Sequence, residues 1–194
     1  MSIVTKRFLS YLLDMFIIFV ILFLIKQLLP INNYELELNN LNELYVEKKI
    51  DSGIYLNQFV SITHNIDKQN FTINLFGFFL IIINFIIIPF LTKGQTIGQK
   101  IFKIKINKKN LTIKDLSGRA VIINGLGYLL FMFIILFIAT NKIYFILINL
   151  LGIFQILVVI INAFMVLYYK EGIADKFTNT RIEEIKWENL QNKN

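Results

Sequence analysis

The 194-residue sequence has no cysteine, one histidine, one tryptophan and two prolines. Without cysteine there can be no disulfide, no zinc–thiolate site and no thiol nucleophile. The single histidine, His64, cannot form a histidine-based metal site. Ser61 and Asp67 are near it in sequence, but a catalytic triad is defined by three-dimensional geometry. We therefore expect His64 to be a surface residue, and the chain to be no enzyme and to need no metal or other cofactor.

Charge is also scarce, at 17% of residues against 56% apolar. The mean hydropathy of +0.61 places the chain in the membrane class. Four stretches have the roughly 17 to 25 apolar residues that a helix needs to cross a bilayer: 8–29, 75–91, 120–139 and 143–169. The first ends without a signal-peptide cleavage site, so it should be a retained anchor. We predict an all-α membrane protein, a four-helix transmembrane bundle forming one domain over residues 1–194.

Basic residues are unevenly distributed along this pattern. Fifteen of the twenty Lys and Arg residues lie before the first stretch, in the loop 92–119 or in the tail 170–194. Cytoplasmic segments carry the excess of Lys and Arg, so we predict that both termini and this loop are cytoplasmic. The loop 30–70 is acidic and should face outward, with a short amphipathic helix near Leu38, Leu41 and Tyr45. Heavy use of Ile, Lys, Asn and Phe is typical of an AT-rich genome, which favours a bacterial plasma membrane.

The cytoplasmic loop contains a strand-like alternation of Lys with Ile over residues 101–106. A polar turn at 107–110 and the apolar residues 111–113 follow, so we predict a small β-ribbon within this loop, between the second and third spans. Positive-inside bias and attraction to anionic lipid headgroups explain the basic surplus. We therefore expect the lipid bilayer as a partner, and no nucleic acid.

Glycines in the same loop suggest testing for a phosphate-binding loop. That motif needs four residues between its glycines and a Lys-Ser or Lys-Thr pair directly after the second. Here three residues separate Gly94 from Gly98, and Gln99 precedes Lys100. The sequence therefore does not predict a nucleotide site.

Three charged residues stand out: Arg7, Asp14 and Asp175. Arg7 and Asp14 are seven residues apart, on one helix face, and Asp14 lies about 10 Å deeper in the membrane. A carboxylate there costs about 2.5 to 3.5 kcal/mol on insertion scales, so Asp14 should face the bundle interior with a partner. Asp175 follows the fourth span at the cytoplasmic boundary. We predict that all three residues gather at the inner face.

These residues and their surroundings resemble the RDD family of membrane proteins, named for an arginine and two aspartates. Lys6-Arg7 through Leu13-Asp14 is similar to the family's opening Arg and Asp. The segment 94–100, with Gly94, Thr96, Gly98 and Lys100, is similar to its Gly-x-Thr-x-Gly-x-x motif, and the segment 174–180, with Asp175, Lys176 and Thr180, to its closing motif. Ile123, before Asn124, stands where members often carry an arginine. Gln99 and Ala174 replace a frequent lysine and histidine.

Two functions remain open at this stage. Arg7, Asp14 and Asp175 could pair with one another and hold the inner end of a structural or partner-binding membrane component, which we favour because polar groups deep in the spans are few. Alternatively, cation/proton antiport has been ascribed to some members of the family, and the resemblance then implies that Asp14 is the exchanging carboxylate. In either case the partners would be a second copy of the chain or another membrane protein.

Overall fold

Helices dominate the computed structural model, which describes residues 1–28 and 33–185. The membrane-length helices are α1 (Ile3–Gln27), the continuous run α4 (Phe71–Ile82), η1 (Ile83–Ile87) and α5 (Ile88–Leu91), and α9 (Asn141–Tyr169). Shorter helices are α2 (Asn33–Val46), α3 (Ser52–Gln69), α6 (Ile97–Ile101), α7 (Ile113–Ile123), α8 (Leu126–Ile138) and α10 (Ile173–Thr178). The end of the first predicted span at Leu29, and the tail beyond residue 185, lie outside the described residues.

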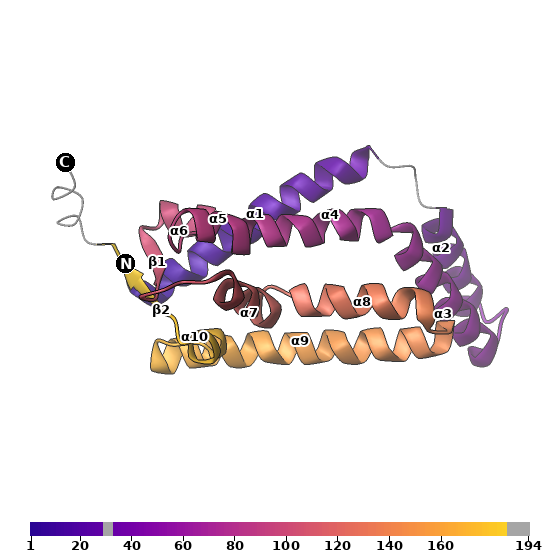
Figure 1. Ribbon diagram of the computed structural model, residues 1–194. Coiled ribbons are helices and arrows are strands. Elements are labelled where there is room, and N and C mark those ends of the chain that lie inside the picture. Colours follow the sequence, from indigo (N-terminus) through magenta and orange to yellow (C-terminus); the bar gives the residue numbers. More distant parts are fainter. Residues whose placement is uncertain (29–32, 186–194) are drawn as a thin grey trace.

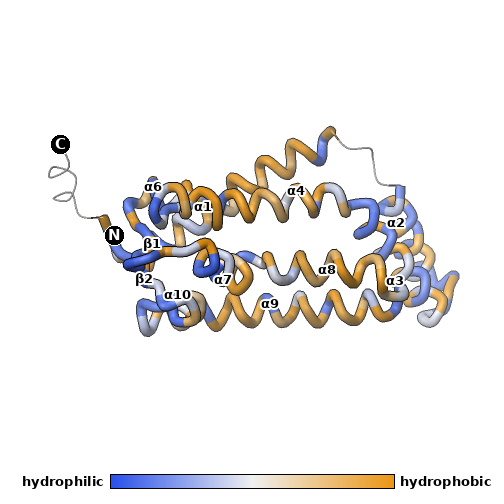
Figure 2. The backbone as a smooth tube through the Cα atoms, viewed as in Figure 1, coloured by the Kyte–Doolittle hydropathy of each residue, from blue (hydrophilic) through white to orange (hydrophobic). Residues whose placement is uncertain are grey.

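The molecule is elongated, with its long helices side by side (Figure 1). One end, which we call the cap end, consists of α2 and α3. The opposite end, the ribbon end, carries α6, α10 and the strands β1 (Ile104–Asn107) and β2 (Arg181–Glu184), and α1 begins there. Hydropathy follows the same axis, because hydrophilic residues gather at both ends and hydrophobic residues fill the helices between them (Figure 2). This banding is what a protein matched to a bilayer requires.

Three helical segments are long and apolar enough to cross a membrane: α1, the α4–α5 run and α9. The α7–α8 pair qualifies as a fourth only if it forms one span, because the two helices are bent by 72°. Gly125 lies at this bend with φ of +72°, a conformation that glycine adopts readily. The predicted span 120–139 is therefore not one straight helix: α7 runs separately from α8, which has only 13 residues.

The predicted β-ribbon has a different partner from the one expected. β1 pairs antiparallel with β2 in the tail, with Ile106 opposite Ile182, and not with residues 111–113, which lead into α7. Ile104 and Ile106 are buried, so the Lys–Ile alternation did mark a strand with one apolar face. The prediction of a small ribbon is confirmed, but its second strand comes from the tail and not from the loop.

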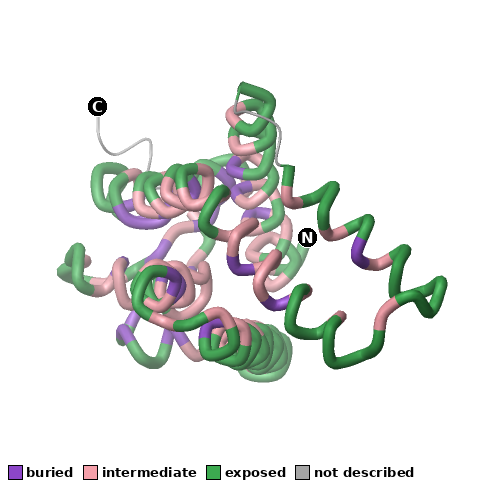
Figure 3. The backbone as a smooth tube through the Cα atoms, turned by 90° about the vertical axis from the view of Figure 1, so that its right-hand side faces the viewer, coloured by how far each residue is buried: buried purple, intermediate pink, exposed green. Residues whose placement is uncertain are grey.

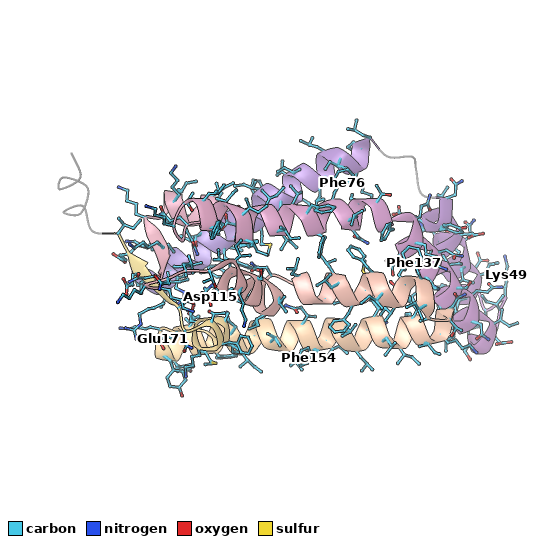
Figure 4. All side chains as sticks on the ribbon, viewed as in Figure 1. Lys49, Phe76, Asp115, Phe137, Phe154 and Glu171 are labelled. Carbon is cyan, nitrogen blue, oxygen red and sulfur yellow. The ribbon has the colours of Figure 1, made fainter. Side chains whose placement is uncertain are left out.

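The outer loop is more ordered than the short helix predicted for it. Two helices, α2 and α3, fill residues 33–69, and Asp51 caps the start of α3 by accepting hydrogen bonds from the amides of Gly53 and Ile54. Leu41 is buried where α2 meets α3. Figure 3, viewed from the cap end, shows both helices as a largely exposed layer. Lys49 lies at this end, while Asp115 and Glu171 lie at the other (Figure 4).

The core is concentrated toward the ribbon end. Its buried members come from α1, the α4–α5 run, both strands, α7 and the start of α8, and include Ile18, Phe85, Ile104, Leu116 and Ile182. By contrast, none of the most apolar 18-residue stretch of α9 is buried, and Phe154 points away from the bundle (Figure 4). Such apolar surface is ordinary where hydrocarbon is the solvent.

Candidate functional site

A cluster of ionised side chains joins three segments at the ribbon end. Asp175, at the start of α10, is 2% exposed and accepts hydrogen bonds from Arg7 on α1 and Arg119 on α7. The Arg119 Nη1–Asp175 Oδ1 distance is 2.6 Å, and the Gly172 amide donates to Oδ2 at 2.8 Å. Arg119 also donates to the Thr180 hydroxyl, and Arg7 to the carbonyl of Lys170. We call Arg7, Arg119 and Asp175 the charge node.

The charge node is a fully paired, desolvated group. Burial on its own raises the pKa of Asp175, but the charges of Arg119 and Arg7 and the Gly172 amide outweigh it and leave the pKa below its ordinary value. Two charge-assisted contacts with arginine also restrict geometry, because guanidinium groups donate in fixed directions. The node therefore ties the start of α1 to α7 and α10.

Asp14 lies apart from the charge node, in a cradle made by the segment before α6. Thr96 donates its hydroxyl proton to Asp14 Oδ2 at 2.6 Å, and the Gly98 amide donates to Oδ1 at 2.8 Å. Thr96 also caps α6 in a capping box with Gln99. The Asp14 side chain is buried, and among the described residues no basic side chain forms an ion pair with it.

Gly98 is required by the closeness of α6 to α1. A Cβ on Gly98 would lie 2.2 Å from the backbone oxygen of Ser10 and 3.0 Å from the Asp14 carboxylate. Gly94 is needed at the next turn for a similar reason, since it has φ of +108° and a Cβ there would lie 2.3 Å from the Ile106 oxygen. The glycines of the Gly-x-Thr-x-Gly pattern therefore allow the close backbone approach that brings two hydrogen-bond donors, Thr96 and Gly98, to the Asp14 carboxylate.

Asn84 completes the surroundings of Asp14. It lies on η1, a π-helical turn, and is buried beside the Asp14 carboxyl. In the described part of the chain, neither polar atom of its amide reaches a hydrogen-bond partner. The wide turn ends just before Pro89, whose ring cannot fit against the carbonyl four residues earlier in a regular α-helix. Single π-helical turns often occur at functional sites.

Comparison with known families identifies the chain. A model of the RDD family matches residues 2–179. The chain belongs to the RDD family. No curated protein and no solved structure matches it. The matched range includes Arg7, Asp14 and Asp175, whereas β2 lies beyond it.

The three residues that suggested the RDD family divide between two sites. Arg7 and Asp175 meet in the charge node, with Thr180 beside them, while Asp14 binds Thr96 and Gly98. The other residues singled out from the motifs lie outside both sites. Lys100 is exposed on α6, Lys176 lies over the Tyr169 ring at 5.3 Å, and Asn124 ends α7 as its C-cap.

Arg119 is the residue that the sequence reasoning missed. Many RDD proteins carry an arginine at the position of Ile123, and Arg119 lies one helical turn earlier on α7. From the sequence, Arg119 contributes only to the basic excess of the loop 92–119, which was predicted to be cytoplasmic. A helical reading of residues 113–123 would have placed Arg119 with the buried Leu116 and Ala120, and that pattern was the available signal.

The prediction that His64 is a surface residue was wrong. His64 is 1% exposed, and its ring nitrogens lie 2.6 Å from Asn141 Oδ1 and 2.9 Å from the Leu136 carbonyl. Its ring stacks on Tyr144, whose hydroxyl donates to Asp67. Burial raises the pKa of Asp67 against the opposing effects of Tyr144 and His64. These contacts of His64 and Asp67 hold α3 against α8 and α9. Spacing along the sequence could not show this tertiary arrangement.

Proposed function

We propose that this RDD protein exchanges protons for monovalent cations at Asp14, and so acts as a cation/proton transporter of the bacterial plasma membrane. One observation carries the proposal: both node arginines pair with Asp175, and within residues 1–28 and 33–185 no basic residue pairs with the buried Asp14. A carboxylate in a low-dielectric site must neutralise its charge, and without an arginine or lysine it does so by taking up a proton or a cation.

The groups around Asp14 suit a cation. The Thr96 hydroxyl oxygen is already in contact with the carboxylate, and Asn84 offers an amide oxygen without a present partner in the described chain. Carboxylate, hydroxyl and amide oxygens are the ligands that hard cations prefer. Protonation of Asp14 would remove the charge that holds the ion, which couples the two ligands by competition for one group.

The proposed topology has four spans with both termini in the cytoplasm. The α7–α8 pair then forms the third, bent span beside α1, the α4–α5 run and α9. The ribbon end faces the cytoplasm, where its lysines meet anionic headgroups, and the acidic cap faces outward. In this arrangement the charge node holds the inner ends of the helices together, the structural role expected from the sequence. We further propose that the chain works as an oligomer, because four helices enclose little volume.

Purified protein in vesicles with a trapped pH-sensitive dye tests the exchange. We expect pulses of sodium or potassium ions to move protons in the wild type, and Asp14→Asn to abolish the response. Glu43→Gln is the matched control, because Glu43 is exposed on the cap. If the wild type moves no protons, or if Asp14→Asn moves them normally, the transport proposal fails and a structural or partner-binding role takes its place.

A further inference from the structure

A cavity of about 380 Å³ lies between α1, the α3–α4 junction and α8, outside both sites described so far. Its wall is polar near the cap and apolar toward the middle of the molecule. The polar members are Lys26, Asp67, Asn70 and Asn74. The apolar members are Ile18, Leu22, Ile73, Gly77, Ile81 and Leu129. Figure 1 shows why space remains here: α1 diverges from α4 toward the cap end.

The α1 side of the cavity leads directly to Asp14. Lys26, Leu22 and Ile18 line the cavity at intervals of four residues, and Asp14 is the next residue in the same series. Residues four apart lie on one helix face, about 6 Å apart along the axis. Ile18, which is 7% exposed, therefore lies one turn from the carboxylate.

The α4 side leads in the same way to Asn84. Asn70, Asn74, Gly77 and Ile81 line the cavity in order, and Asn84 follows Ile81 by three residues. Two helix faces thus run from a polar mouth, through the apolar pair Ile18 and Ile81, to Asp14 on one helix and Asn84 on the other.

We propose that this cavity is a water-filled vestibule that gives cations access from the cap side to Asp14, with Ile18 and Ile81 as the hydrophobic constriction that closes it. The inference rests on the cation exchange proposed above and names its outer route. Asp67 supplies a carboxylate at the mouth that can attract cations, and the ammonium group of Lys26, which also lines the mouth, pairs with Glu35 at 3.6 Å. The constriction separates the two polar regions in the way that apolar gates interrupt water in channels.

Water suits the mouth of this cavity better than a lipid chain does. The amide side chains of Asn70 and Asn74 line it without a hydrogen-bond partner among the described residues. Hydrocarbon would leave both amides unsatisfied, whereas water supplies donors and acceptors to each. Gly77 adds no side chain to this space, and a Cβ there would lie in contact with Leu22 at 3.4 Å.

Cysteine accessibility tests the vestibule independently of transport, because the chain contains no cysteine of its own. Asn74→Cys and Leu22→Cys place a thiol in the cavity, and Phe76→Cys places one on the exposed side of α4 at similar depth (Figure 4). A membrane-impermeant thiol reagent is added to intact cells and, separately, to opened membranes. We expect both cavity positions to react at least about tenfold faster than Phe76→Cys, because the reactive thiolate needs water.

Further variants make the result decisive. Gly77→Leu, introduced with Leu22→Cys, should slow labelling by filling the passage, while Gly152→Leu on α9, away from the cavity, should not. Asp14→Asn should leave labelling unchanged while it abolishes proton movement. A wild type whose cavity positions are labelled but that moves no protons would therefore overturn the exchange and not the cavity. If Leu22→Cys is as unreactive as Phe76→Cys, lipid or packed side chains fill the space and the vestibule is refuted. Labelling only in opened membranes would place its mouth on the cytoplasmic side and would refute outer access.

Discussion

At the scale of single residues, the two aspartates of the family name do different things. Asp175 carries its charge between two arginines, whereas Asp14 is held by neutral donors. A carboxylate locked by two guanidinium groups is poorly suited to releasing and rebinding a proton, because its charged form is strongly favoured. In the proposed function, the exchange therefore takes place at Asp14 and the structural role falls to Asp175.

Asp175→Asn should destabilise the protein, because it leaves Arg7 and Arg119 buried without a counter-charge. Breaking one partner of a buried ion pair typically costs about 3 to 5 kcal/mol. We expect a clearly lower melting temperature in detergent. Glu171→Gln is the control, since Glu171 pairs with Arg181 at the exposed surface, and its melting temperature should stay close to that of the wild type. Equal melting temperatures for all three proteins would contradict a structural node.

The lowered pKa of Asp175 also predicts how the stability of the protein depends on pH. The pKa of Asp175 is lowered in the folded protein, so its contribution to stability is complete above the unfolded value of about 3.9. It is then lost as the pH falls from there through the folded pKa. Melting curves should show a constant gap between wild type and Asp175→Asn from about pH 7 to pH 5, narrowing below about pH 4. A gap that stays unchanged at lower pH would exclude this carboxylate as its source.

At the scale of elements, short irregular segments set the geometry that long helices cannot. α6 has five residues and η1 a single wide turn, yet with the Thr96 N-cap of α6 they place the two hydrogen-bond donors of Asp14 and the nearby Asn84. The α7–α8 bend likewise turns Arg119 toward Asp175 while α8 continues along the bundle. The regular long helices supply the apolar surface. The short or bent segments between and within them position the residues of the charge node and the Asp14 site.

Gly98→Ala tests the contact between α6 and α1. The added Cβ would lie 2.2 Å from the Ser10 oxygen, so α6 must move away and the Gly98 amide must leave Asp14. We expect lower thermal stability and loss of cation-driven proton movement. Gly152→Ala is the matched control, because its Cβ meets nothing closer than 4.0 Å and alanine favours helix by about 1 kcal/mol over glycine. Stability equal to the wild type in Gly98→Ala would refute this close approach.

Substitutions at Gly125 test the bend between α7 and α8. A Cβ there meets nothing within 4 Å, so only the backbone conformation penalises a side chain. Gly125→Ala should cost about 1 to 2 kcal/mol, the penalty of the left-handed region. Gly125→Asn should cost less, because asparagine tolerates that region. Thermal unfolding of the two variants compares them directly. If alanine is tolerated as well as asparagine, α7 and α8 are not bent at this residue.

At the scale of the whole molecule, charge and hydropathy follow one axis. Hydrophilic residues lie at both ends of an apolar zone (Figure 2); the sequence makes the cap acidic and the ribbon end basic. Toward the ribbon end lie the hydrophobic core, the charge node and the Asp14 site. The cavity opens toward the cap. A transporter needs such an asymmetry, because its ion site must be reached from one side at a time.

The orientation is open to direct measurement. Glu43→Cys on the cap and Lys109→Cys in the loop after β1 are both exposed positions. With an impermeant thiol reagent on intact cells, we expect Glu43→Cys to react and Lys109→Cys to react only after the membrane is opened. Positive-inside topology is the physical reason. The reverse pattern would invert the proposed topology, and with it the side from which the vestibule opens.

From the sequence by itself we could predict that the protein lies in a membrane and where its long helices run. Helical spans follow from runs of apolar residues, because hydrocarbon offers no partner to unpaired backbone groups. The strand at residues 104–107 and the importance of Arg7, Asp14 and Asp175 were also visible, because alternation and intramembrane charge are local properties. The RDD family could be named from the same residues.

Only the tertiary structure decided which groups meet. Arg7 faces Asp175 across 168 positions of sequence, and β1 pairs with the tail rather than with its neighbour in the loop. Burial of His64 and the recruitment of Arg119 likewise depend on how α3, α7 and α9 pack. Spacing along a chain describes single elements, whereas ion pairing and desolvation arise where separate elements pack together. That is why Asp14 was expected beside an arginine and is found without one.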